Sequence, residues 1–111
     1  MTNIIKWAKR RKLPDRRACI TFEFRCNSLA YTATVSHFEN GDLAEIFINN
    51  SKVGSDSDSA AKDSAVVASI ALQHGVPLNT IRKALLRDPR GVASSPLGVA
   101  LDLIAGSSSS C

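Results

Sequence analysis

The chain has 111 residues, enough for one domain with a modest hydrophobic core and too few for several domains. With 44% hydrophobic and 22% charged residues it has an ordinary soluble composition, and no apolar run approaches the roughly 20 residues that cross a bilayer. The first residues lack the apolar region of a secretory signal, which predicts a cytoplasmic protein that does not associate with a membrane.

Basic residues crowd the beginning of the chain. The formal net charge is +4, and a single acid, Asp15, stands in residues 1–17 against Lys6, Lys9, Arg10, Arg11, Lys12, Arg16 and Arg17. We expect residues 1–12 to form a flexible basic arm ahead of a folded domain at residues 13–105. Such an arm can lie along a phosphate backbone, and the alternative is a solvated, frayed terminus.

The first predicted strand spans residues 18–26, where apolar and polar residues alternate with a period of two. Its apolar face consists of Ala18, Ile20, Phe22, Phe24 and Cys26. Asn27 and Ser28 are expected to form a two-residue turn into a second strand at residues 29–38. The apolar face of that second strand consists of Leu29, Tyr31, Ala33 and Val35.

A third strand is predicted at residues 43–49, after Asn40 and Gly41, which tolerate the positive φ of a tight hairpin turn. One side of this strand consists of Ala44, Ile46 and Ile48, and the other of Leu43, Glu45 and Phe47. Apolar residues on both sides predict a strand that is central in its sheet or covered on both faces.

The first helix is predicted at residues 59–74, after a polar loop at residues 50–58. Ser57 or Asp58 is expected to accept hydrogen bonds from its first N–H groups. Small residues should let this helix lie close to the sheet, with an inward face of Ala60, Ser64, Val67, Ile70 and Ala71. Gly75 supplies a left-handed C-terminal cap, and Pro77 prevents continuation.

A second helix is predicted to begin at Pro77 or Asn79 and to end near Arg87, and a third to begin at Ser95 and Pro96. The Ser-rich residues 106–111 predict a disordered tail. Strands followed by helices predict an α+β fold, an antiparallel three-stranded meander with about three helices packed on the sheet. One thin layer cannot cover all of Val35, Leu43 and Phe47, so we expect a homodimer built on a sheet or helix face.

The loop before the first helix is a candidate anion site. Free N–H groups and the dipole at a helix N-terminus favour an anion. Four residues are placed to contact it: Lys52, Gly54, Ser55 and Ser57. Asp56 and Asp58 bring negative charge to the same place, so the alternative is a helix that caps itself.

The corner around Gly75 is a candidate for binding nucleic acid. Ala71, Gly75 and Ile81 have the spacing of many helix-turn-helix units, although any tightly packed helix–Gly–helix corner gives it too. The residues predicted for this alternative function lie in the corner and in the arm: Thr80, Arg82 and Lys83, with Arg10, Arg11, Lys12, Arg16 and Arg17. We expect any such binding to be weak.

No motif predicts catalysis, a cofactor or a metal site. His37 and His74 have no His or Cys partner at metal-ligand spacing, and neither a nucleophile elbow nor a Walker loop is found. The three cysteines, Cys19, Cys26 and Cys111, match no paired metal spacing and predict thiols and not a disulfide.

Three segments, in this order along the chain, carry a resemblance: Leu13-Pro14-Asp15, Gly41-Asp42-Leu43-Ala44-Glu45-Ile46-Phe47-Ile48 and Leu72-Gln73-His74-Gly75-Val76-Pro77-Leu78. They resemble the TSCPD domain family, the small C-terminal domain of adenosylcobalamin-dependent ribonucleotide reductases. The resemblance covers residues 13–104, and it implies that cobalamin and the radical chemistry belong to a barrel outside this domain. The Thr-Ser-Cys-Pro-Asp signature of many members is absent, so any metal or thiol role of that motif does not carry over.

We therefore expect a free-standing, non-catalytic accessory module linked to nucleotide reduction and DNA synthesis, with no turnover of its own. Its expected partners are a second copy of the chain or a reductase-type protein. The alternative is a small basic protein that binds nucleic acid through residues 1–17 and the region from Arg82 to Arg90.

Overall fold

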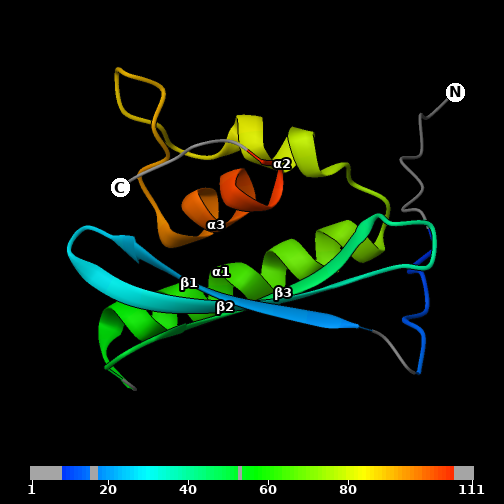
Figure 1. Cartoon of the computed structure of the whole chain (residues 1–111). Coiled ribbons are helices and arrows are strands. Elements are labelled where there is room, and N and C mark those ends of the chain that lie inside the picture. Colours follow the sequence, from blue (N-terminus) through cyan, green and yellow to red (C-terminus); the bar gives the residue numbers. More distant parts are fainter. Residues whose placement is uncertain (1–8, 16–17, 53, 107–111) are drawn as a thin grey trace, which may run out of the picture.

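The computed structural model describes residues 9–15, 18–52 and 54–106. Three strands, β1 (Cys19–Cys26), β2 (Leu29–His37) and β3 (Leu43–Asn50), precede three helices, α1 (Asp56–Gln73), α2 (Leu78–Ala84) and α3 (Pro96–Ile104) (Figure 1). Both strand pairs are antiparallel and the sheet order is β1-β2-β3, which confirms the predicted α+β meander. The expectations for Arg16, Arg17, most of the arm and nearly all of the Ser-rich tail lie outside the described residues.

The turn between β1 and β2 is the predicted two-residue turn. Cys26 pairs with Leu29, and the two residues between them, Asn27 and Ser28, have φ angles of 52° and 66°. Two successive positive φ angles match the right-handed twist of the flanking strands, which is why short hairpins favour them.

The first helix begins earlier and faces another way than the sequence predicts. Ser55 is its N-cap and accepts the N–H of Asp58, so the predicted caps Ser57 and Asp58 are wrong. The side that is buried consists of Asp58, Ala61, Ala65, Ala68, Ser69, Leu72 and Gln73. The predicted inward face, from Ala60 to Ala71, is therefore wrong in phase. The alanines at positions 61, 65 and 68 give the helix its close approach to β3.

Side chains of α1 bind the open edge of β3. Of the two alternatives for the third strand, the central position is wrong, because β2 is central and β3 lies at the edge. Cover on both faces holds only for the first part of β3, where Leu43 and Glu45 are buried, whereas Phe47 is exposed. Ser69 Oγ accepts the N–H of Ile46 at 2.9 Å and donates to its carbonyl oxygen at 3.0 Å, and Gln73 Nε2 donates to the carbonyl oxygen of Ala44 at 3.2 Å. An edge strand otherwise presents unpaired backbone groups to other chains, so α1 protects this one.

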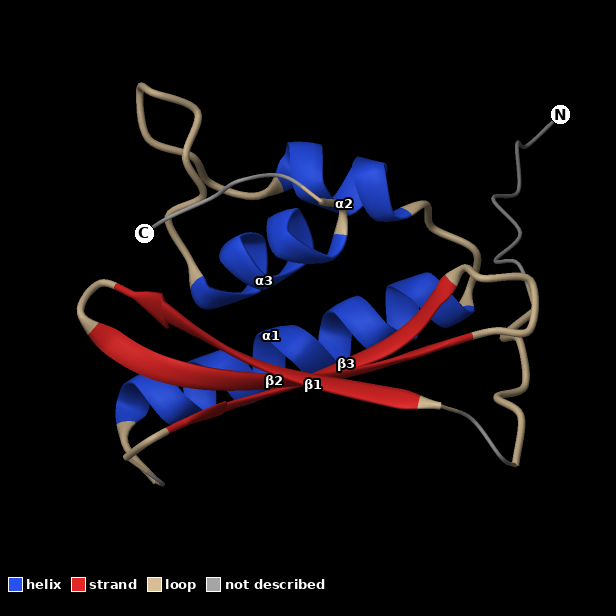
Figure 2. Ribbon diagram, in the orientation of Figure 1, coloured by secondary structure: helices blue, strands red, loops and turns tan. Residues whose placement is uncertain are grey.

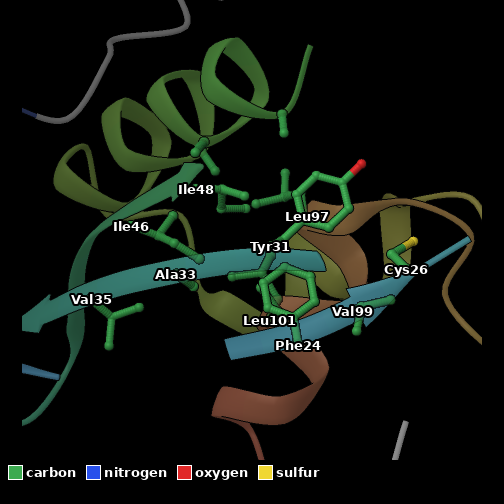
Figure 3. Packing of buried hydrophobic residues seen from close by; sticks show 14 of the residues in the cluster. Phe24, Cys26, Tyr31, Ala33, Val35, Ile46, Ile48, Leu97, Val99 and Leu101 are labelled. Carbon is green, nitrogen blue, oxygen red and sulfur yellow. The ribbon is translucent and has the colours of Figure 1, made fainter. Parts of the chain in front are cut away.

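The core lies between the sheet, α1 and α3, as Figures 2 and 3 show. Ile46, Ile48 and Leu101 are among its largest fully buried side chains. The helix α2 packs mainly against α3 and has no buried residue. The two helices α2 and α3 therefore form a small unit on one side of the sheet.

The predicted end of the second helix near Arg87 is wrong, because α2 stops at Ala84 and Leu85 is extended. The chain then forms a bridge between Arg87 and Ala93, which brings Arg87 to Asp102 of α3. The predicted start of the third helix is confirmed: Ser95 is the N-cap of α3, and Pro96 opens its first turn.

Of the three residues that predict a homodimer, Val35, Leu43 and Phe47, only Phe47 is exposed. Val35 and Leu43 are buried within the chain and need no partner. Phe47, by contrast, is 48% exposed on the face of the sheet that α1 does not cover. Among the described residues, the other large apolar side chains that are exposed lie on three segments: Ile20 on β1, Val66, Val67 and Ile70 on α1, and Leu86 after α2.

Candidate functional site

The predicted anion loop is organised around the carboxylate of Asp58. One oxygen of this carboxylate accepts the N–H of Gly54 at 3.0 Å, and the other accepts the N–H of Asn50 at 2.9 Å. The ammonium of Lys62 lies 2.9 Å away, one helical turn along α1. Asp58 thus joins the end of β3 to the beginning of α1, and its buried side chain is fully bonded.

These bonds hold the pKa of Asp58 far below its ordinary value of 3.8, at about 2. The N–H of Asn50 contributes most to the shift, followed by the N–H of Gly54 and by Lys62. Hydrogen bonds to the ionised form stabilise it against protonation. Asp58 therefore stays a carboxylate that only accepts hydrogen bonds.

The predicted anion ligands are engaged in the same loop. Ser55 Oγ caps α1 and donates to the carbonyl oxygen of Lys52 at 2.8 Å, and Ser57 Oγ accepts from Asn50 Nδ2 at 2.8 Å. The helix is thus capped by Ser55 of its own loop, and not by Asp58 as the self-capped alternative predicts. Anion binding by Lys52, Gly54, Ser55 and Ser57 stays a prediction, and an added anion has to compete with the carboxylate of Asp58.

Acid should loosen the junction that Asp58 holds. The folded-state pKa lies below the ordinary value, so its stabilising contribution is present above about pH 4 and is lost as the pH falls toward 2. Asp58→Asn should therefore lower the urea midpoint clearly at about pH 6 and much less at about pH 2.5. The matched control is Asp56→Asn, in the exposed first turn. A difference between native protein and Asp58→Asn that does not change with pH would contradict this assignment.

The described part of the basic arm lies against the C-terminal end of α1. Arg10 Nε donates to Gln73 Oε1 at 2.6 Å, and the backbone N–H of Arg11 donates to the carbonyl oxygen of Gln73 at 2.7 Å. The guanidinium of Arg11 stacks 3.6 Å above the ring of Phe38 and pairs with Asp42 at 3.3 Å. These contacts dock residues 10 and 11 onto the domain, whereas the side chain of Lys12 is exposed.

The predicted base-reading residues of α2 have divided roles. Thr80 and Lys83 are exposed, but Arg82 Nε donates to Asp102 Oδ1 at 2.9 Å. Arg87, which lies in the region 82–90 predicted for the same alternative, binds both oxygens of Asp102 at 2.7 and 2.8 Å. A basic cavity of about 420 Å³ lies over this cluster, lined by Asn79, Arg82, Lys83, Arg87 and Gly91.

The carboxylate of Asp102 is the centre of that cluster. The bonds from Arg87 first, and then those from Arg82, hold its pKa at about 2, well below the ordinary 3.8. The same contact raises the pKa of Arg87. Asp102 is buried on α3. Its bonds to Arg82 and Arg87 therefore join α3 to α2 and to the bridge that follows α2.

The structure does not bring all the predicted residues to one place. The loop at residues 52–57 lies at the N-terminal end of α1 and the arm at its C-terminal end, and an 18-residue helix is about 27 Å long. The arm does reach the Gly75 corner, because Arg11 shares a cavity of about 250 Å³ with residues 75–78. The predicted anion loop is therefore separate from the predicted nucleic-acid residues of the arm and the Gly75 corner.

Sequence reasoning missed the buried polar residues Asp58, Ser69, Gln73 and Asp102 as a group. A signal for three of them exists in the sequence: positions 58, 69 and 73 fall on the same helical face as Ala61, Ala65 and Leu72. Polar residues in phase with an alanine stripe indicate bonds to a neighbouring backbone.

In the described ranges, no three His, Cys, Asp or Glu side chains are grouped as ligands for a metal ion. Cys19 lies on the surface and Cys26 in the core, both as thiols. Over the same ranges, none of the helices combines the length and the apolar character that a membrane crossing requires.

Comparison with known proteins identifies relatives of the sequence. The sequence profile of the TSCPD domain matches residues 6–111. A vitamin B12-dependent ribonucleotide reductase from Bradyrhizobium diazoefficiens is 34% identical over 76 residues, which are 68% of this chain and 6% of that enzyme. Enzymes of the same name from Streptantibioticus cattleyicolor and Streptomyces clavuligerus are each 29% identical over 90 residues, 78% of this chain and 15% and 9% of theirs.

The chain thus spans only a small part of the length of these curated relatives. No solved structure matches the chain significantly.

Proposed function

Because the chain belongs to the TSCPD domain family, we propose that it is a non-catalytic accessory module of B12-dependent ribonucleotide reduction, which acts by binding a reductase-type protein. The observation that carries this proposal is the similarity to a minor part of three large reductases. A domain that forms a small part of a large enzyme has a surface suited to contact the rest of it. On this proposal, the module serves the supply of deoxynucleotides for DNA synthesis.

The buried acids support binding as the role. Asp58 and Asp102 are committed to the junctions described above, and Glu45 accepts a hydrogen bond from Ser36 at 2.8 Å. Catalytic acids need a pKa near the working pH, whereas the pKa values of Asp58 and Asp102 are lowered to about 2. These carboxylates therefore hold the fold together.

The cavity beside His37 is too small for cobalamin. His37, a residue type that ligates metals, lines a cavity of about 310 Å³ together with Ile20, Phe22, Leu103 and Ile104. A corrinoid ring with its nucleotide tail is far larger than that space. The proposal therefore assigns cobalamin to the reductase partner and not to this chain.

A reconstituted assay tests the proposal. A B12-dependent reductase from which the TSCPD domain has been deleted should bind the purified chain, with a dissociation constant of about 1–10 µM in calorimetry. With adenosylcobalamin, a dithiol and a ribonucleotide, the chain alone should form no deoxynucleotide. The intact reductase is the matched control, because its own domain should block the site. Two results would overturn the proposal: formation of deoxynucleotide by the chain alone, or the absence of any heat of binding when the chain is titrated into the truncated reductase.

Nucleic-acid binding is the second candidate, favoured by exposed Lys9, Lys12 and Lys83 on a chain of net charge +4. Binding should be weak, blind to sequence and steeply dependent on salt, since each neutralised phosphate releases counterions. Deleting residues 1–12 should flatten the salt slope in a fluorescence titration. Arg82→Ala should leave sequence preference unchanged, because its guanidinium binds Asp102. Tight binding to one duplex that requires Arg82 would instead support a helix-turn-helix reader.

The proposal also includes self-association. A module that carries exposed apolar side chains on a helix gains stability by pairing them with a second copy. In a two-fold homodimer the same surface of both copies forms the interface, so each favourable contact occurs twice.

A further inference from the structure

The outer side of α1 carries a short apolar stripe, although it faces away from the core. Val66 is 47% exposed and Ile70 is 42% exposed, and the two lie one helical turn apart on the same side. These two residues define the outer α1 stripe. Val67 is turned about 100° from Val66 around the helix and lines the groove beside α2 instead. A helix side that faces solvent normally carries polar residues, so the stripe indicates a contact that the described residues do not supply.

The stripe leads directly to the point where the beginning of the chain is anchored. Gln73 follows Ile70 by three residues and continues the same side of α1. Arg10 Nε donates to Gln73 Oε1 at 2.6 Å, and the backbone N–H of Arg11 donates to the carbonyl oxygen of Gln73 at 2.7 Å. Residues 1–8 are therefore tethered at the C-terminal end of the stripe.

Residues 1–8 contain the apolar side chains that such a stripe needs. They include Ile4, Ile5 and Trp7, the only tryptophan of the chain, with Lys6 as their single charged residue. The TSCPD profile begins to match at residue 6, so Trp7 lies within the matched region. A tryptophan ring has a large apolar surface, and its exposure to water is unfavourable. The segment therefore gains stability by packing on an apolar surface within its reach.

The length of the tether fits the stripe. Ile70 and Val66 lie about 4.5 Å and about 10.5 Å before Gln73 along the axis of α1, at roughly 1.5 Å per residue. Trp7 precedes Arg10 by three residues, which span up to roughly 10 Å when the chain is extended. A segment that turns back along α1 from its anchor thus brings Trp7 to both side chains of the stripe.

We propose that residues 4–8 bind the outer α1 stripe of their own chain, with the ring of Trp7 packed on Val66 and Ile70. The bonds of Arg10 and Arg11 to Gln73 hold the segment beside the stripe and so lower the entropic cost of this contact. The inference goes beyond the proposed function, because the contact forms within one chain and needs no reductase. A second copy can reach Val66 and Ile70 only by displacing the segment.

The fluorescence of Trp7 tests the contact in the full chain, because no other tryptophan contributes. In the native chain its emission should be blue-shifted, and its quenching by acrylamide several-fold weaker, relative to the chain unfolded in urea. Ile70→Glu should shift the emission to the red and restore the quenching, since burial of an unpaired charge is unfavourable. The matched control is Ile20→Glu, the same substitution at an exposed isoleucine of β1, which should leave both readouts unchanged. Circular dichroism should show the native spectrum for both variants.

Urea unfolding tests the same pair of side chains without introducing a charge. Trp7→Ala and Ile70→Ala should each lower the urea midpoint. The double variant should lose clearly less than the sum of the two, because both substitutions remove one shared contact. Trp7→Ala combined with Ile20→Ala should show additive losses, and additive losses for the pair of Trp7 and Ile70 would contradict the contact.

The remaining outcomes would overturn the inference in distinguishable ways. Quenching of Trp7 as strong in the native chain as in the unfolded chain would show that no surface covers it. Release of Trp7 by Ile20→Glu and not by Ile70→Glu would assign the segment to the cavity beside Leu103. Protection that is lost on dilution from about 100 µM to about 1 µM would assign the contact to a second copy and keep self-association. Binding to the truncated reductase is measured separately, so the accessory role stands or fails independently of these results.

Discussion

Asp102→Ala is expected to lower the free energy of unfolding by about 3 kcal/mol. The substitution leaves the guanidinium groups of Arg82 and Arg87 without the buried carboxylate that both of them bind. Removing one partner of a buried ion pair costs about 3–5 kcal/mol, and the lower end applies because the two arginine side chains are 21% and 27% exposed. Urea unfolding followed by circular dichroism at neutral pH measures the change.

Asp102→Asn refines this test. The amide keeps the shape of the side chain and can accept one hydrogen bond, so the loss should be smaller than with alanine. Its effect should also shrink in acid, because the folded-state pKa of Asp102, about 2, lies below the ordinary 3.8 and its stabilisation is lost as the pH falls between these values. Glu39→Ala, at an exposed position, is the control and should change the stability by less than about 0.5 kcal/mol. A loss for Asp102→Ala no larger than this control would mean that the cluster contributes nothing to the fold.

Strand positions follow from the sequence because alternation is a local property. The period of two in β1 and β2 identifies both strands to within one residue, and Asn27 with Ser28 identifies the turn. The start of α3 is equally local, since a serine followed by a proline defines a helix N-terminus.

The phase of α1 could not be read from the sequence, because the helix has two sides that both satisfy the pattern. One side carries Ala61, Ala65 and Leu72, and the other carries Val67 and Ile70. The apolar periodicity alone favours the bulkier set, which faces outward. Close approach to β3 selects the alanines, and this choice depends on contacts between residues distant in sequence.

The polar sites could be predicted only in part, because they too depend on contacts between residues distant in sequence. The loop at residues 52–57 was found because it precedes a helix N-terminus. The partners of Asp102 lie 15 and 20 residues away in the chain, and they are brought together by the packing of α2 on α3 and by the bridge between Arg87 and Ala93. A lone aspartate inside an apolar helix such as α3 was nevertheless a signal, since burial of a carboxylate requires a cation.

Phe24→Ala is expected to cost about 3–4 kcal/mol, a large part of the roughly 5–15 kcal/mol that stabilises a domain of this size. Phe24 is buried and its ring stacks on that of Tyr31, with centroids 5.5 Å apart and planes at 16°. Phe22, two residues earlier on the same face, is only partly buried and should cost about 1–2 kcal/mol when truncated. Glu23→Ala, on the opposite face, should cost less than about 0.5 kcal/mol.

The order of these three losses tests how far α3 covers the sheet. Phe24 and Cys26 belong to the buried core together with residues of α3, whereas Phe22 and Ile20 line the open cavity beside Leu103. Urea midpoints measured for the three variants under one condition give the order directly. Equal losses at positions 22 and 24 would mean that this cavity is closed in solution, and a large loss at position 23 would mean that the register of β1 is shifted by one residue.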